Sequence, residues 1–362
     1  MIPWAKPSLF GNEEEFLVDA IKSSWISDGP YVSKFEEEFS QLMEVKNTIT
    51  TSNGTTALTL ALLGLGINPG DEVIVPGFCF VAPGNTVIQI GAKPVYADVD
   101  IESWCIDPKS IKKLINSKTK AIIPVHNYGN MCNMEEIMEI AKENNLYVIE
   151  DAAEAAFSKY NDKFAGTLGD IGCFSFQATK TITMGEGGAV VTDNSVFNKK
   201  MRKFRNHGMT STKYMHDAIG YNFRLTNIQA ALGCSQLKNL NEILFNKKRI
   251  YDSYLKNLGN LDGISFQKIT PNSDPLIWAV AIKIEPSKFK SYRDFLMKEL
   301  SKRGIETRPG FYPFSKMSFY NAPSLPVSES ISKDIIVLPS FVSLKEKEID
   351  YISDNIKSLI KN

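Results

Sequence analysis

No apolar run in the sequence approaches the roughly twenty residues that a membrane-spanning helix needs. The 362 residues carry 41 basic and 41 acidic side chains, and the resulting net charge of zero gives no reason to expect nucleic acid or an anionic membrane as a partner. The first residues lack the basic and apolar regions of a signal peptide, and no repeat or low-complexity segment is present. These absences predict a globular, cytoplasmic protein.

Cysteine and histidine are too few and too scattered to suggest a metal site. The five cysteines form no CxxC pair and no Cys/His cluster, and they stand at positions 79, 105, 132, 173 and 234. Only three histidines are present. We expect the thiols to be reduced and buried as small apolar side chains, and we expect no metal.

What the chain does contain, from about residue 50 onward, is an alternation of short apolar runs with helical segments. Apolar runs without polar alternation indicate strands that are buried on both faces of a sheet. The expected strands are residues 72–76, 93–98, 121–125, 147–150, 171–176 and 189–192. The expected helices in this half are residues 12–22, 31–43, 56–65, 108–115 and 134–143. This order predicts an α/β fold with a mostly parallel sheet.

The pattern changes after residue 222. A nearly continuous helical region is expected at residues 225–257, followed by a strand at 278–284, a helix at 292–303, an irregular segment at 307–313 and a helix at 346–359. We place a domain boundary near residue 240. The larger domain is then residues 1–240, and the smaller one is residues 241–362.

Lys180 is the most informative candidate site residue. It lies in a short polar turn between two apolar strands, just before the glycine-rich bend of residues 185–188. A lysine at the mouth of a buried sheet loses solvent, which favours the neutral amine that Schiff-base chemistry requires. A solvated lysine in a β-turn is the alternative. Which of the two interpretations is correct depends on whether other residues supply the rest of a cofactor site.

Two further segments supply chemistry that an aldehyde cofactor would need. The cluster around Gly54 and Thr55 opens a helix, and helix N-termini bind phosphate; a plain N-cap by Ser52 or Thr55 is the alternative. Asp151 follows a buried strand, where its carboxylate could pair with a pyridinium nitrogen or could simply cap a helix.

Ser175 and Phe80 complete the candidate cofactor site. Ser175 ends the strand before Lys180 and could add a hydroxyl donor to a phosphate, and Phe80 follows a strand and could stack on a flat ring. Each could equally be core packing. Pyridoxal 5′-phosphate (PLP) requires a phosphate-binding site, a ring that stacks on it, a carboxylate for its pyridinium nitrogen and a lysine, and these candidates together could provide all four.

Two more polar residues are candidates for the substrate. His126 follows the strand at 121–125 and either faces the pocket or makes a structural contact at the strand end. Arg308 precedes Pro309 in the irregular segment and either grips a phosphate or carboxylate or forms a salt bridge.

The chain also resembles a known family. The motifs SNGTTAL (52–58), GDEVIVP (70–76), IEDAAEA (149–155), FSFQATKTITMGEGGAVVTD (174–193), RNHG (205–208) and YNFRLTNIQAALG (221–233) are similar to those of the DegT/DnrJ/EryC1/StrS family of PLP-dependent aminotransferases. The resemblance spans nearly the whole chain. It implies a fold-type-I transferase, with a mostly parallel seven-stranded sheet in a large domain and a smaller C-terminal α+β domain.

The resemblance also implies a role for each motif residue. Lys180 would form the Schiff base with PLP, Asp151 would bind the pyridine nitrogen, and Glu154 would lie near the phenolic oxygen of the ring. Phe80 would stack on the ring, while Gly54, Thr55 and Ser175 would hold the phosphate. Asn222 would reach the phosphate of the neighbouring subunit in a homodimer with a shared active site, and Arg224 of the same motif is a candidate substrate contact.

The expected reaction is a transamination. The amino donor implied by the family is L-glutamate or a similar amino acid, and the preferred acceptor is a nucleotide-linked 4-keto-6-deoxy sugar. Alternatives are a small phosphorylated ketone such as a triose phosphate, a sugar dehydratase, in which histidine would replace Lys180, and a non-catalytic PLP-binding regulator. No DNA-binding extension flanks the domain, which disfavours the regulator.

Overall fold

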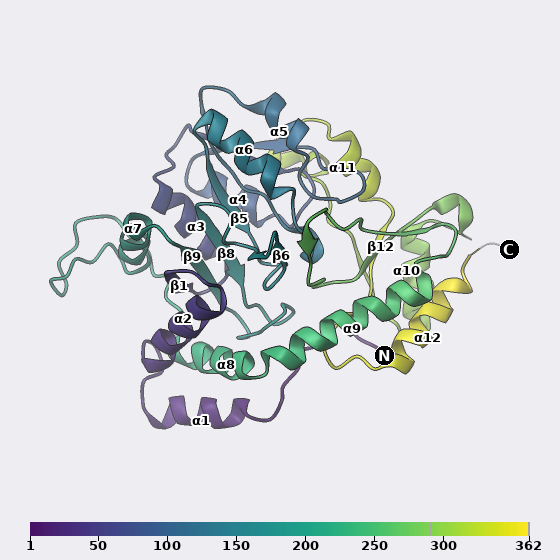
Figure 1. Ribbon diagram of the computed structural model, residues 1–362, viewed down its shortest axis with the longest axis horizontal. Coiled ribbons are helices and arrows are strands. Elements are labelled where there is room, and N and C mark those ends of the chain that lie inside the picture. Colours follow the sequence, from purple (N-terminus) through teal and green to yellow (C-terminus); the bar gives the residue numbers. More distant parts are fainter. Residues whose placement is uncertain (290, 361–362) are drawn as a thin grey trace.

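The computed structural model describes residues 1–289 and 291–360. Its centre is a seven-stranded sheet with the order β1-β9-β8-β5-β4-β2-β3 (Figure 1). The strands are β1 (Asn47–Thr51), β2 (Glu72–Pro76), β3 (Lys93–Ala97), β4 (Thr119–Ile122), β5 (Tyr147–Asp151), β8 (Ile171–Ser175) and β9 (Gly188–Thr192). Strands β3, β2, β4, β5 and β8 pair in parallel, and only β9 runs antiparallel to its neighbours. The predicted mostly parallel, seven-stranded sheet is confirmed.

Helices cover both faces of this sheet because successive side chains of a strand point to opposite sides. Val148 and Phe174 pack with α2, α5, α6 and α8 on one face, whereas Ile149 and Cys173 pack with α3, α4 and α7 on the other. The helices of this part are α1 (Glu13–Lys22), α2 (Pro30–Leu42), α3 (Gly54–Leu65), α4 (Ala82–Gln89), α5 (Pro108–Leu114), α6 (Met134–Asn144), α7 (Ser195–Arg205) and α8 (Asn227–Lys238).

The C-terminal third forms a second, antiparallel sheet with the order β10-β12-β14-β13. Its strands are β10 (Ile264–Phe266), β12 (Ala281–Ile284), β13 (Arg308–Pro309) and β14 (Ile335–Val337), and its helices are α9 (Leu240–Leu258), α10 (Arg293–Lys302), α11 (Pro326–Ile331) and α12 (Glu346–Lys357). A small third sheet joins β6 (Lys159–Tyr160), β7 (Lys163–Phe164) and β11 (Ser273–Asp274). The division at residue 240 stays a prediction, and residues 290, 361 and 362 of the predicted smaller domain lie outside the described residues.

The structure differs from the sequence-based expectation in several elements, among them α4, α11, β10 and β14, which were not expected, and β12, which begins at Ala281 instead of residue 278. The helical region after residue 225 breaks at Asn239, whose side-chain amide bonds Asn12 Oδ1 and Ser235 O. The segment expected to be irregular contains the short strand β13, because Arg308 and Pro309 pair with β14. Strand β1 was not expected, since its threonine-rich sequence lacks an apolar run.

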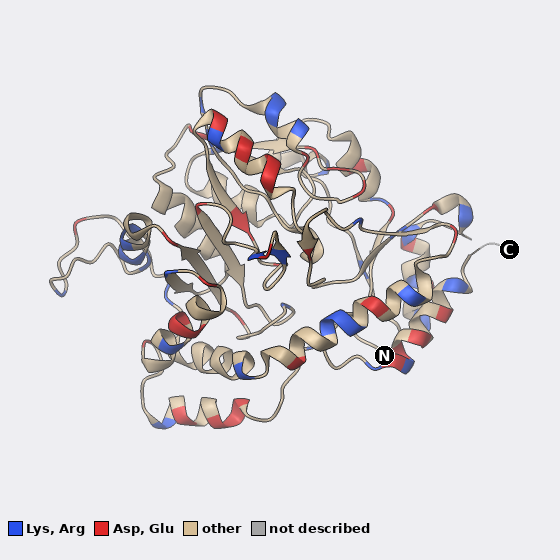
Figure 2. Ribbon diagram, in the orientation of Figure 1, with Lys and Arg blue, Asp and Glu red and all other residues tan. Residues whose placement is uncertain are grey.

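The N-terminal segment lies against the C-terminal part of the fold. Ile2 forms a parallel bridge with Ile305, and the Trp4 N–H donates to the Glu306 carboxylate at 3.0 Å. Figure 2 shows acidic and basic residues interspersed along outer helices such as α9 and α12. Within residues 1–289 and 291–360, no helix combines the length and the apolar character needed to cross a membrane.

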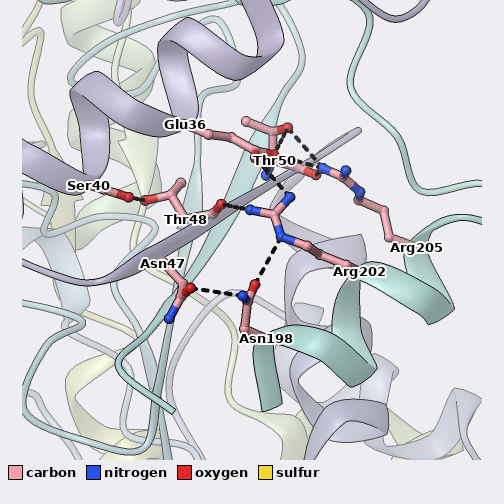
Figure 3. Close-up of polar contacts among 8 residues, drawn as sticks. All are labelled: Glu36, Ser40, Asn47, Thr48, Thr50, Asn198, Arg202 and Arg205. Carbon is pink, nitrogen blue, oxygen red and sulfur yellow. Dashed lines mark hydrogen bonds and ion pairs between the residues drawn. The ribbon is translucent and has the colours of Figure 1, made fainter. Parts of the chain in front are cut away.

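A partly buried ion-pair network explains why polar β1 can pair inside the fold (Figure 3). Glu36 on α2 accepts hydrogen bonds from Thr50 N at 2.9 Å, from Arg202 at 2.9 Å and from Arg205 at 2.8 Å. Arg202 also donates to the Thr48 carbonyl at 2.8 Å. The network therefore ties α2, β1 and the last turn of α7 together.

Replacing Glu36 with Gln should destabilise the protein by about 2 kcal/mol, because Arg202 and Arg205 would lose their shared carboxylate. Burial disfavours the charged form of Glu36, but Arg205, Arg202 and the Thr50 hydrogen bonds outweigh it and lower its pKa from 4.5. The ion pairs of Glu36 therefore stabilise the folded protein above about pH 4.5, and this stabilisation is lost as the pH falls through the lowered pKa of Glu36.

Urea unfolding of the wild type and of Glu36→Gln at pH 7 and at about pH 3 tests this, with exposed Glu37→Gln as the matched control on the same helix. The difference in unfolding free energy should shrink at the lower pH. An effect no larger than that of Glu37→Gln at pH 7 would contradict the network's role.

Candidate active site

A cavity of about 1060 Å³ opens where β5 and β8 end. Eight of the residues singled out from the sequence line it, namely Gly54, Thr55, Phe80, Asp151, Glu154, Ser175, Lys180 and Arg308. They come from segments more than 250 positions apart in the chain. The fold therefore gathers most of the candidate set at the carboxyl edge of the parallel strands, where α/β sheets place their sites.

Lys180 lies on the turn between β8 and β9. The turn is closed by hydrogen bonds from Ala178 N to Gly185 O at 2.9 Å and from Met184 N to Phe176 O at 2.8 Å. Gly185 has a φ of +77°, which a glycine adopts without strain. The Lys180 side chain is 15% exposed, and its Nζ lies 3.5 Å from Glu154 Oε1. The lysine is thus shielded yet faces the cavity.

Asp151 and Glu154 are both buried, at 5% exposure each. Burial, with a contribution from the nearby Glu154 carboxylate, raises the pKa of Asp151 to about 6, although the Ala153 hydrogen bond and Lys180 act to lower it. Glu154 Oε2 accepts the Tyr128 N–H at 2.8 Å. A cation in the cavity next to Asp151 would offset the cost of keeping this carboxylate ionised.

The N-terminus of α3 forms the other wall. Asn53, rather than Ser52 or Thr55, is the N-cap: its side chain accepts from Thr56 N at 2.9 Å. Within the described residues, the Gly54 and Thr55 N–H groups have no recorded acceptor. A Cβ on Gly54 would lie 2.8 Å from Ser175 Cβ, so only glycine leaves room there. Free N–H groups at a helix N-terminus are suited to bind an anion.

Several aromatic side chains line the cavity. Phe80 is 57% exposed, and its ring packs edge-on against Phe311 with a centroid distance of 6.4 Å. Phe311 in turn stacks on Tyr128 at 5.1 Å with nearly parallel rings. Phe80 thus keeps a free face for a flat ligand, as its predicted stacking role requires.

His126 does not reach the cavity. It is fully buried; its Nδ1 accepts the Cys132 N–H at 3.1 Å, so its Nε2 carries the proton and donates to Glu150 at 3.0 Å. Glu150 also accepts N–H groups from Gly166, Leu168 and Gly169. The geometry therefore gives His126 the structural role that the sequence left open.

The other three polar candidates lie farther out. Arg308 is half-exposed at the cavity wall and forms an ion pair with Glu306 at 2.6 Å. It therefore both forms the salt bridge and lines the cavity, which the sequence analysis had treated as alternatives. Arg224 donates to Asn206, and exposed Asn222 forms a backbone bridge with the same residue. Neither Asn222 nor Arg224 lines the cavity of its own chain.

Sequence reasoning missed Trp278 and Tyr128 as parts of the site. Lys180 Nζ lies 3.8 Å from the centroid of the Trp278 ring, and Tyr128 holds Glu154 from a left-handed backbone conformation with a φ of +60°. Each lies close to the cavity from a segment distant in sequence. A local sequence pattern does not indicate that either residue belongs to the site, although Gly129 after Tyr128 does indicate a turn at that position.

Comparison with known proteins decides the family. The model of the DegT/DnrJ/EryC1/StrS aminotransferase family matches residues 8–357. The chain belongs to this family. Its members are aminotransferases that use PLP. The family resemblance stated from the motifs is confirmed.

Individual relatives match along nearly the whole aminotransferase chain. A protein named GDP-perosamine synthase from Escherichia coli O157:H7 is 43% identical over 98% of this chain and 97% of its own. Another protein of that name, from Vibrio cholerae, is 40% identical over 99% of both. Among solved structures, a putative sugar aminotransferase from Streptococcus pneumoniae in its PLP form has a TM-score of 0.91 at 27% identity, covering 99% of this chain and 98% of its own.

The residues present fit PLP. Lys180 can supply the amine, Asp151 a buried carboxylate for a protonated ring nitrogen, Phe80 a free ring face, and Gly54, Thr55 and Ser175 donors for a phosphate. All line one cavity. The aminotransferase therefore has a protein partner for each part of its cofactor.

The buried Asp151 should cost the cofactor-free aminotransferase stability. Because its folded pKa is raised, folding takes up a proton, and stability falls as the pH rises from about 4 through about 6. Asp151→Asn should remove this loss and raise the unfolding free energy at pH 8 by about 2 kcal/mol, while it weakens PLP retention.

Urea unfolding of the cofactor-free wild type and variant at pH 5 and pH 8 measures the effect, and exposed Asp162→Asn is the control. The stability gain should be present at pH 5 and about twice as large at pH 8. Equal stability of wild type and Asp151→Asn at both pH values would show that the carboxylate is not strained by burial.

Proposed function

We propose that this aminotransferase moves an amino group from L-glutamate, or a similar donor, to the keto group of a nucleotide-linked 4-keto-6-deoxy sugar. The observation that carries the proposal is the single cavity in which Lys180, Asp151, Glu154 and the α3 N-terminus meet. The two relatives named GDP-perosamine synthase support the nucleotide-sugar acceptor.

The side chains divide the work as follows. PLP, when bound, supplies an aldehyde and an electron-accepting ring. Lys180 Nζ would hold the cofactor and would move the proton at the donor Cα, first as base and then as acid. The Asp151 carboxylate keeps the ring nitrogen protonated, and Glu154 keeps Lys180 at the cavity wall.

The size of the cavity favours the larger acceptor. Its volume of about 1060 Å³ leaves room for a nucleoside diphosphate beside the sugar, whereas a triose phosphate would fill a small part. Arg308 at the wall offers a guanidinium for phosphate oxygens. Lys180 itself argues against the dehydratase, and the shielded position of Lys180 beside Asp151 argues against a regulator without catalysis.

The active enzyme is proposed to be a homodimer with shared sites. The segment that follows α7 extends away from the body of the protein (Figure 1). It exposes large apolar side chains, with Tyr214 at 76%, Met215 at 58% and Ile219 at 87% exposure. Such a patch fits a second copy of the chain. Asn222, at the end of this segment and outside its own cavity, would then contact the partner's phosphate.

The five cysteines are buried and unpaired, which fits the proposed cytoplasmic location.

The acceptor can be identified by a screen against the pyridoxamine form of the enzyme. Nucleotide-linked 4-keto-6-deoxy sugars should restore the absorption of the aldehyde form at least about a hundredfold faster than triose phosphates, because the small acceptors leave the cavity unfilled. Lys180→Ala should show no turnover with any acceptor. Faster reaction with a triose phosphate would overturn the nucleotide-sugar assignment while leaving the aminotransferase intact.

Mixing two inactive variants tests the shared site. Lys180→Ala and Asn222→Ala homodimers should each have little activity, but in a mixed dimer one of the two sites regains both residues. Statistical exchange of subunits should therefore restore up to about a quarter of the wild-type rate. No recovery after verified subunit exchange would show that Asn222 does not act on the partner's site.

A further inference from the structure

Trp278 is fixed on several sides next to the reacting lysine. Its backbone N–H donates to Tyr128 O at 2.9 Å, and its indole Nε1 donates to the Thr179 carbonyl at 2.7 Å. Thr179 is the residue directly before Lys180. The ring is 7% exposed, and its face lies under Lys180 Nζ at 3.8 Å. The tryptophan thus contacts both the backbone and the amine of the lysine turn.

The carbonyl of Trp278 is held by a second lysine. Lys247 on α9 is 4% exposed, and its Nζ donates to Trp278 O and to Ser340 O, both at 2.7 Å. Among the described residues, no carboxylate lies within ion-pair distance of it. Burial, together with the nearby charge of Lys180, lowers the pKa of Lys247 to about 7. A buried ammonium without a carboxylate is costly, so its contact with Trp278 calls for a functional reason.

We propose that the Trp278 ring is the resting place of the Lys180 amine whenever it is not bonded to the cofactor, and that Lys247 is the positioning residue that holds this ring in place. In a transamination the lysine is displaced and must return in each half-reaction. A cation over an aromatic face is attracted by the ring quadrupole, more strongly when it is shielded from water. The contact keeps the amine beside Glu154 and the cavity instead of letting it swing away.

The proposal rests on the proposed role of Lys180, and the variants separate the two. Trp278→Leu should lower kcat about tenfold with the KM of the keto acceptor unchanged within about twofold, since the loss concerns the lysine and not the substrate. Trp278→Phe keeps a ring face and should stay within about threefold of wild type. Equal losses in both variants would show that the ring face is not what matters.

A double-variant cycle tests whether Lys247 acts through Trp278. Lys247→Met should lower kcat several-fold, and exposed Lys248→Met on the same helix is the matched control. The double variant with Trp278→Leu and Lys247→Met should have a kcat within about twofold of that of Trp278→Leu alone. Once the Trp278 ring is gone, the loss of Lys247, which acts by holding that ring, should have no further effect. Losses that multiply would overturn the coupling. If Lys247→Met does not fold, Lys247→Gln takes its place.

A second readout does not depend on turnover. In the pyridoxamine form Lys180 carries no cofactor bond, and its acetylation by acetic anhydride can be followed by peptide mass spectrometry. Lys180 should react severalfold faster in Trp278→Leu and Lys247→Met than in wild type, Trp278→Phe and Lys248→Met. Wild-type labelling and kcat in Trp278→Leu, with Lys180→Ala inactive, would refute this inference alone; an active Lys180→Ala would refute the role of Lys180 itself.

Discussion

Two carboxylates, Asp151 and Glu154, are buried beside one lysine at the carboxyl edge of the central sheet. Charges of this kind are costly away from water unless each finds a partner. Lys180 lies near Glu154, and burial raises the pKa of Asp151 to about 6. A cationic ring nitrogen of PLP in the cavity would balance this charge.

The reversed strand β9 is what brings the lysine to these carboxylates. Because β9 runs antiparallel to β8, their connection is a turn at the edge where β5 also ends, instead of a helical crossover to the far side. β1 is antiparallel to β9 and so ends at the same edge, where α3 begins. A Cβ on Gly188, at the start of β9, would lie 2.5 Å from the Asn53 backbone. The turn that carries Lys180 and the N-terminus of α3 therefore lie directly beside each other.

The parts of this arrangement that depend on local pattern could be predicted from the sequence. Buried apolar runs identified six strands of the central sheet, and the motifs around Lys180, Asp151 and Gly54 indicated residues that do line one cavity. Strand β1 was missed because its threonines are buried through Glu36, Arg202 and Arg205, which lie far away in sequence. Trp278 was missed for the same reason, because its position depends on contacts with Lys247 and Tyr128.

His126 illustrates the opposite case, in which a local pattern suggested more than the structure supports. A histidine after a strand at the functional edge is a reasonable substrate contact, yet Cys132 and Glu150 occupy both of its ring nitrogens. Whether such a side chain turns inward or toward the cavity depends on the hydrogen-bond partners that the fold places beside it. The Glu150 carboxylate also accepts N–H groups of residues 166, 168 and 169, a contact that the strand pattern does not indicate.

Lys180 is the residue that we expect to carry the cofactor. Borohydride reduction of the PLP-loaded enzyme, followed by digestion and peptide mass spectrometry, tests this directly, because reduction makes the lysine–cofactor bond permanent. We expect the added cofactor mass on Lys180 alone. Reduced cofactor on another lysine, or none on any lysine of an enzyme that retains PLP, would contradict it.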